Sequence, residues 1–148
     1  MKYLPAIIFG VLLWLALQII FSFSANYSPI NDFLSSQPNL TANSADYIWL
    51  GLHDSFIKLS VCFAFLMAYK VFCNKHPFNL TSAFILQLPT LLGIFLMTFN
   101  AVTLGNTPNI NSYYGLVDVL GILITATGVL IVYYLLNVIG KKRIIQPV

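Results

Sequence analysis

Four long apolar segments alternate with polar segments along the chain of 148 residues. The apolar segments cover about 4–23, 47–72, 82–103 and 116–139. Each is about 20 residues or longer and carries few charges, which is the length that an α-helix needs to cross the hydrocarbon core of a bilayer. The pattern predicts an all-α membrane protein in which residues 1–148 form a single domain of four transmembrane helices.

Composition supports the membrane assignment. The chain is 59% hydrophobic and only 7% charged, whereas a soluble domain is roughly 25% charged. A water-soluble fold could not cover that much apolar surface, and four spans leave no room for a separate soluble domain. The formal net charge of +3 comes from the cytoplasmic flanks of the spans. It indicates topology and contact with anionic lipid head groups rather than a nucleic-acid surface, so no nucleic acid partner is expected.

The polar segments between the spans differ in length. Residues 25–46 form the longest, and Pro29 and Pro38 interrupt regular structure in it, so it is predicted to be an external loop. The segment 74–79 is much shorter, which predicts that the helices on either side are antiparallel neighbours. The four helices are therefore expected to form an antiparallel bundle.

Four residues predict local features of the helices. Asn79 or Thr81 can cap the helix over 82–103, because a side-chain oxygen there can accept from the first free backbone N–H groups. Pro89 lies inside the same helix, removes one backbone hydrogen bond and is expected to bend it. Gly140 is predicted to end the last helix.

The charged residues are sorted to the two ends of the predicted spans. Acidic residues lie at or near one end: Asp32, Asp46, Asp54 and Asp118. Basic residues near the other end act as topology anchors: Lys2, Lys70, Lys75, Lys141, Lys142 and Arg143. Short loops rich in Lys and Arg stay in the cytoplasm, so both termini and the middle loop are predicted to be cytoplasmic.

Ionisable and polar groups near the outer membrane surface form the candidate functional site. Asp54 and Lys58 are four residues apart on one helix and can pair along its face. Asp118 enters the last helix at a similar depth and is the expected cross-helix partner of Lys58, while His53 and Asn100 complete a polar outer cluster.

This cluster has three interpretations, which the sequence leaves open. Lys58 can extend to the outer head groups while Asp118 satisfies a helix end near water, which gives the cluster no function. The same residues can form a structural ion-pair network. They can also form a site for a ligand or a transported ion, in an outward-opening polar vestibule.

Small and polar residues recur at helical spacing on the last two predicted helices. Such stripes let another helix approach closely, and they are predicted to be packing surfaces. The stripe on the last helix follows Asp118 and contains Gly121, Thr125 and Gly128; the stripe on the third contains Thr90 and Gly93.

Several kinds of chemistry lack a signature in the sequence. Cys62 and Cys73 are eleven residues apart on one helix, about 16 Å at 1.5 Å per residue, so they are not expected to form a disulfide. No phosphate-binding loop or nucleophile motif occurs, and His53 and His76 lie on opposite sides of the membrane. We therefore expect no enzyme activity, no cofactor and no metal.

The layout of four spans, internal termini, little exposed mass and a basic tail resembles the membrane immunity proteins that protect against pore-forming bacteriocins. The resemblance covers topology only. It implies a bacterial inner-membrane protein that acts by helix association inside the bilayer, as an immunity or defence-type protein or as a membrane subunit. Membrane lipid and either a homo-oligomer or another membrane protein are the expected partners. The alternative function is a small oligomeric channel or transporter.

Overall fold

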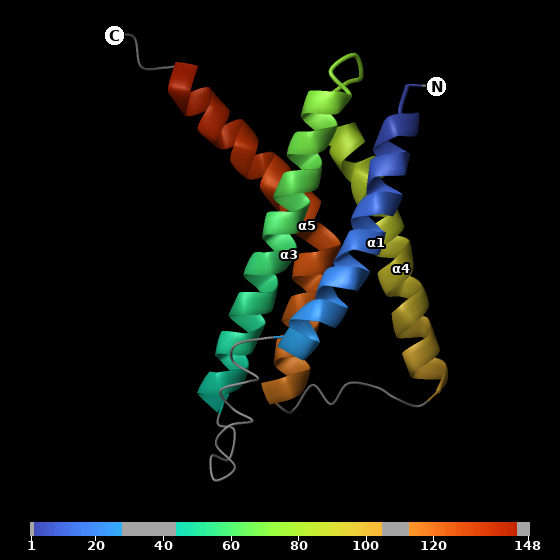
Figure 1. Ribbon diagram of the computed structural model, residues 1–148, viewed down its shortest axis with the longest axis vertical. Helices are drawn as coiled ribbons and strands as arrows, with labels where there is room; N and C mark the ends of the chain where they lie inside the picture. The colour runs from blue at the N-terminus through green and yellow to red at the C-terminus, as the bar shows by residue number, and fades with distance from the viewer. Residues whose placement is uncertain (1, 28–43, 105–112, 145–148) are drawn as a thin grey trace.

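The computed structural model describes residues 2–27, 44–104 and 113–144, and in this part of the chain all regular structure is helical. The helices are α1 (Leu4–Tyr27), α3 (Ser44–Phe72), α4 (Leu80–Thr103) and α5 (Tyr113–Ile144) (Figure 1). The all-α prediction is confirmed for the described residues. Side chains are described for residues 2–20, 22–23, 49, 51–100, 102–104 and 119–138.

Three helices contain segments long and apolar enough to cross a membrane: Gly51–Phe72, Leu80–Asn100 and Val119–Val138. In α1 the corresponding apolar run, Leu4–Ile20, is shorter, although α1 as a whole has 24 residues. Three of the four predicted spans therefore correspond to helices that are long and apolar enough to cross a membrane.

The helix ends differ in places from the predicted ones. Asn79 caps α4 as expected: its side chain accepts from Ser82 N, and Ser82 Oγ accepts from Asn79 N in return. The predicted stop at Gly140 is wrong, because α5 continues to Ile144. A glycine inside a helix costs about 1 kcal/mol relative to alanine but does not by itself end the helix. The centre of the predicted external loop, 28–43, lies outside the described residues.

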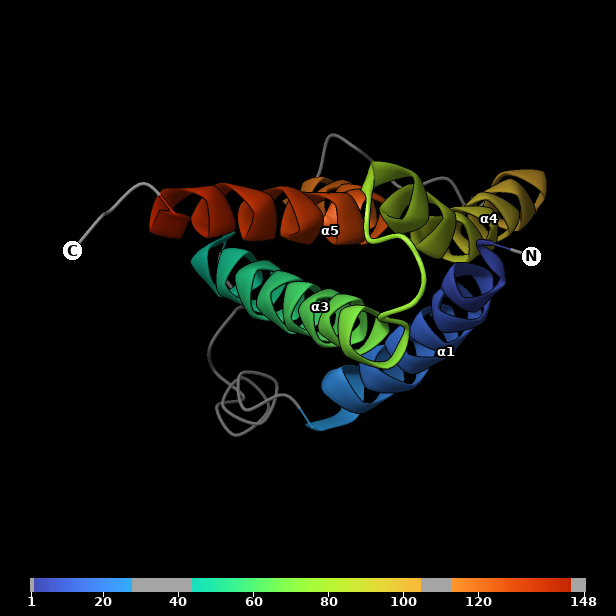
Figure 2. The same ribbon diagram turned by 90° about the horizontal axis from the view of Figure 1, so that it is seen from above.

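The helices form a four-membered ring in which α1 packs on α3 and α4, and α5 packs on the same two helices. α3 and α4, although joined by the short segment 73–79, lie diagonally across the ring (Figure 2). The prediction that they are neighbours is wrong. Seven extended residues can reach about 23 Å, which exceeds the roughly 14 Å diagonal of four helices packed about 10 Å apart.

Two of the packed pairs are parallel. Gly10 of α1 lies against Leu86 and Pro89 of α4, and further along both helices Trp14 lies against Gly93. In α3 and α5, Lys58 lies near Gly121, and further along Cys62 lies near Gly128 (Figure 1). The expected antiparallel arrangement therefore does not describe these pairs, which associate as two parallel pairs.

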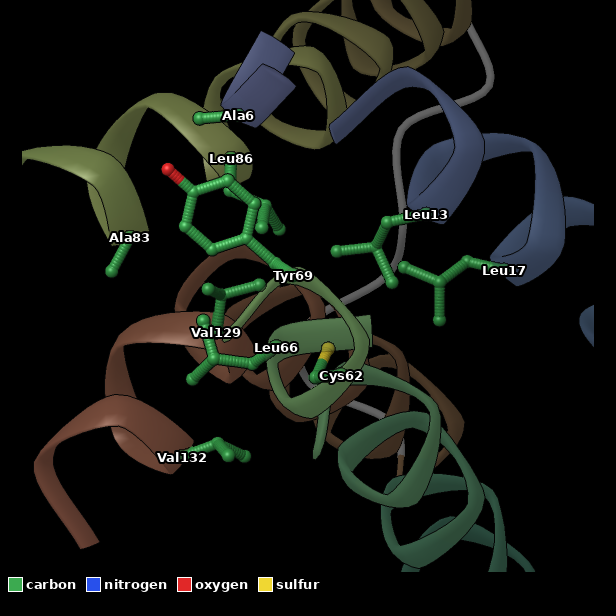
Figure 3. Packing of buried hydrophobic residues seen from close by; sticks show 10 residues of the cluster. All are labelled: Ala6, Leu13, Leu17, Cys62, Leu66, Tyr69, Ala83, Leu86, Val129 and Val132. Carbon is green, nitrogen blue, oxygen red and sulfur yellow. The ribbon is translucent and has the colours of Figure 1, made fainter. Parts of the chain in front are cut away.

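The core is formed by buried apolar side chains from all four helices, shown in Figure 3. Its members are Ala6, Leu13, Leu17, Cys62, Leu66, Tyr69, Ala83, Leu86, Val129 and Val132. The largest is Tyr69, whose ring meets Phe9 edge to face with centroids 5.8 Å apart. Burial of these side chains holds the ring of helices together through close packing.

The outer surface is also apolar. Large hydrophobic side chains are exposed on every helix, among them Ile8, Phe63, Leu92 and Leu135. A monomeric soluble protein rarely exposes apolar patches on this scale. The distribution is the one expected when lipid or another membrane protein surrounds the helices.

Candidate functional site

Asp54 and Lys58 of α3 form an ion pair, with Oδ2 and Nζ 2.6 Å apart. The Asp54 side chain is 25% exposed and the Lys58 side chain 14% exposed. The two residues are one helical turn apart with the acid first, which is the favourable orientation relative to the helix dipole. The pair places two opposite charges together near the middle of α3 and in the first half of its apolar segment Gly51–Phe72.

The Lys58 ammonium group also reaches α5. A β-carbon added to Gly121 would lie 3.5 Å from Lys58 Nζ, an ordinary van der Waals distance. Position 118 lies one turn before Gly121 on the same face of α5, by helix geometry. The predicted contact between Lys58 and Asp118 falls on a side chain outside the described ones.

The other two members of the predicted outer cluster are placed differently. His53 is half-buried on α3, next to Asp54 in sequence. Asn100 lies near the end of α4, and this end is on the opposite side of the molecule from the start of α3 in both views (Figures 1 and 2). The structure therefore does not bring Asn100 to the Asp54–Lys58 pair.

The small residues of α5 face helices of the same chain. A β-carbon on Gly128 would lie 2.9 Å from Cys62 Sγ on α3, so the missing side chain lets the two helices approach closely. Thr125 Oγ1 donates to the carbonyl oxygen of Gly121, 2.7 Å away. The stripe is thus occupied within the molecule and is not a free surface.

The stripe on α4 faces α1. A β-carbon on Gly93 would overlap the Nε1 edge of the Trp14 indole. Thr90, one turn earlier, is 1% exposed. Thr90 Oγ1 and Trp14 Nε1 are buried without a hydrogen-bond partner among the described groups. Two orphaned polar atoms thus lie along a single helix interface, where each carries a desolvation cost.

Gln87 was not among the residues that the sequence singled out, yet its side chain links two helices. It is fully buried in α4. Its Nε2 donates to the carbonyl oxygen of Thr125, 2.9 Å away, and its Oε1 accepts from Val129 N, 3.0 Å away. An isolated amide in an apolar span needs a partner inside the protein, and that rule could have drawn attention to Gln87 in the sequence.

The topology anchors lie at two places. Lys70 and Lys75 are exposed at the end of α3 and in the segment 73–79. Lys141, Lys142 and Arg143 belong to the last turns of α5, and their side chains are outside the described ones.

The described residues contain no group of three or more His, Cys, Asp or Glu side chains placed to hold a metal ion. Cys62 and Cys73 are both free thiols. Asp54 and Lys58 form an ion pair within α3. Gln87 joins α4 to α5 by hydrogen bonds to Thr125 and Val129.

No protein family, curated protein or solved structure matches the chain. The fold and the site define an all-helical protein in which three helices have the length and composition of membrane spans. Inferences about its function therefore rest on the geometry of this chain alone.

Proposed function

We propose that this protein is a small polytopic inner-membrane protein that acts by helix association inside the bilayer. Its role is that of a membrane subunit or of an immunity or defence-type protein. In this proposal α1 also crosses the membrane, which gives four spans in all. Both termini and the segment 73–79 then face the cytoplasm. The sorting of Lys and Arg to that side supports the orientation.

The observation that carries the proposal is the exposure of the last part of α4, from Phe95 onward. Every described side chain from Phe95 to Leu104 is exposed, so the described helices leave this part uncovered on all sides. It diverges from α5 and α1 toward its end (Figure 1). A part of a helix that the other described helices leave exposed is a suitable surface for a helix of another chain.

The side chains of this last part of α4 suit a protein contact as well as a lipid contact. Phe95 and Phe99 stack, with centroids 6.2 Å apart and ring planes 24° apart, and present a flat aromatic surface. Aromatic side chains dominate the energetics of protein interfaces. The stripes around Gly93 and Gly128 face α1 and α3 instead, so a partner must use the outer surface.

Photo-crosslinking tests the association. A photoreactive amino acid at Phe99 should give a crosslink to protein in the native membrane, either to a second copy or to a different chain. The same group at Leu12, an exposed apolar residue of α1, is the matched control and should crosslink lipid. Absence of any protein crosslink from Phe95, Phe99 and Val102 would contradict the proposed surface.

The alternative function is a small oligomeric channel or transporter with an outward-facing polar vestibule. The Asp54–Lys58 pair favours it, because charges near a helix interface in a membrane span are costly and commonly functional. The distant position of Asn100 and the apolar core below the pair weigh against a polar path through one molecule. Ion flux through liposomes that contain the wild-type protein or the Lys58→Met variant distinguishes the two functions.

A further inference from the structure

The segment 73–79 between α3 and α4 is held by hydrogen bonds at its centre. The carbonyl oxygen of Pro77 accepts from Tyr69 Oη of α3 at 3.2 Å and also from Ser82 Oγ of α4. Ser82 Oγ lies 2.7 Å from Asn79 Oδ1 in the capping box. One carbonyl thus joins the end of α3 to the start of α4.

Contacts to the other two helices fix the same segment further. His76 Nδ1 lies 3.1 Å from the carbonyl oxygen of Lys2, so Nδ1 carries the hydrogen in this contact. The ring of Phe78 packs on that of Tyr133 of α5, with centroids 5.5 Å apart. A connection between spans is usually mobile, but this one is attached to the α1 end of the chain and to all three of the other helices.

Three lysines surround this fixed segment. Lys2, Lys70 and Lys75 are all exposed. Lys70 Nζ lies 5.2 Å from the ring centroid of Phe78, and Lys2 Nζ lies 5.7 Å from that of Tyr3. The contact with Phe78 holds the Lys70 ammonium group near the segment while leaving its charge available, and Lys2 is joined to the segment through its carbonyl oxygen and His76.

The acidic residues of the helices lie toward the other end of the molecule. Asp46 and Asp54 are in the first half of α3, and Asp118 is near the start of α5. Both helix starts lie at the end opposite to the segment 73–79 (Figure 1). The three lysines therefore form a net positive surface at the level where the span Gly51–Phe72 ends and the span Leu80–Asn100 begins.

We propose that Lys2, Lys70 and Lys75 form a binding site for the phosphate of an anionic phospholipid head group. Phosphate oxygens accept charge-assisted hydrogen bonds from ammonium groups, and basic surfaces between spans at the cytoplasmic side bind anionic lipid. The rigid segment places the three charges in advance, which lowers the cost of ordering them on binding. The site does not depend on the partner surface of α4.

Native mass spectrometry of the full-length protein in mild detergent tests this site, with phosphatidylglycerol and phosphatidylcholine as probes. The wild-type protein should bind phosphatidylglycerol more tightly. The variant with Lys2→Gln, Lys70→Gln and Lys75→Gln should lose on the order of a hundredfold in that affinity, about fivefold per lysine. Phosphatidylcholine binding should stay unchanged, which also reports that the variant is folded.

The matched control removes three charges elsewhere, by Lys141→Gln, Lys142→Gln and Arg143→Gln, and should keep most of the affinity. Inorganic phosphate should not displace the lipid. Should the triple variant fail to fold, Lys75→Gln alone should still weaken phosphatidylglycerol binding about fivefold. Equal loss in the two triple variants, or equal binding of the two lipids by the wild-type protein, would overturn the proposal.

Discussion

Gln87 of α4 accepts a hydrogen bond from the backbone N–H of Val129 of α5, with Oε1 and N 3.0 Å apart. The same amide donates to the carbonyl of Thr125, and residues 125 and 129 are the i and i+4 partners of the α5 ladder. Gln87 therefore competes with the helical hydrogen bond between the Val129 N–H and the Thr125 carbonyl of α5. Sharp bends in helices occur where a side chain enters the ladder, and α5 is bent near its middle (Figures 1 and 2).

Gln87→Leu is predicted to straighten α5 with little loss of stability. Two interhelical hydrogen bonds in a membrane contribute about 1 kcal/mol together. Without them, the freed Thr125 carbonyl and Val129 N–H can form a stronger helical hydrogen bond with each other. Spin labels at Leu120 and Val138, both exposed, report the geometry. Their backbone separation should approach about 27 Å, the length of 18 residues in a straight helix.

Gln87→Glu is the matched comparison, because it keeps the length of the side chain and the acceptor but loses the donor. It should disturb the contact with Thr125 while leaving that with Val129. A spin-label distance that is the same in wild type and Gln87→Leu would show that the bend has another cause.

Gly93→Ala is predicted to destabilise the α1–α4 pair, because the new methyl group would overlap the ring of Trp14. Overpacking of this kind costs about 1–3 kcal/mol. Gly121→Ala is the control, since among the described side chains its methyl group would meet Lys58 Nζ alone, at 3.5 Å, and should change stability little. Denaturation in mixed detergent, followed by the helical signal in circular dichroism, measures both.

A double-mutant cycle makes the interpretation specific. Trp14→Leu should reduce the cost of Gly93→Ala, because the two residues are in direct contact and their effects should not add. Strictly additive effects would mean that Gly93 matters for some reason other than the space that Trp14 needs.

Lys58→Met and Asp54→Asn should each lower stability by about 1–2 kcal/mol, between the values for exposed and for buried ion pairs. The reason is that each single change leaves one charge without its partner across 2.6 Å. The double variant should be more stable than the sum of the single effects predicts. Thermal unfolding of the four proteins in one detergent tests this, and full additivity would mean that the pair is not coupled.

Reporter fusions test the orientation and the fourth span together. Green fluorescent protein should fluoresce at either terminus, and alkaline phosphatase should be active when inserted within 25–46. If α1 does not cross the membrane, the N-terminus and the segment 25–46 lie on the same side. With the three remaining spans one terminus would then be external, so loss of fluorescence at either terminus would contradict the four-span topology.

The sequence predicted features that depend on local chemistry. Apolar length indicated the helices, and polar side chains before an apolar run gave Asn79 and Thr81 as candidate caps, of which Asn79 caps α4. The spacing of Asp54 and Lys58 indicated their ion pair. Each of these depends on residues a few positions apart, and for such residues the backbone geometry of a helix fixes the distance.

Features that depend on how the helices are arranged were not predictable in the same way. The short segment 73–79 suggested a pair of neighbours, but α3 and α4 lie across the ring because the connection is long enough for both arrangements. The choice depends on fits such as that of Trp14 on Gly93. Gln87 was missed because its two partners are backbone groups of α5, which no side-chain motif reveals.

The mass and composition of the native complex, extracted in mild detergent from its own membrane, test the central claim of intramembrane association most directly. We predict a complex larger than one chain of 16.5 kDa. A multiple of that mass would indicate self-association, and a stoichiometric foreign subunit would identify the partner. A single chain that carries only lipid, with no protein crosslink from Phe99 in the membrane, would contradict the proposed function.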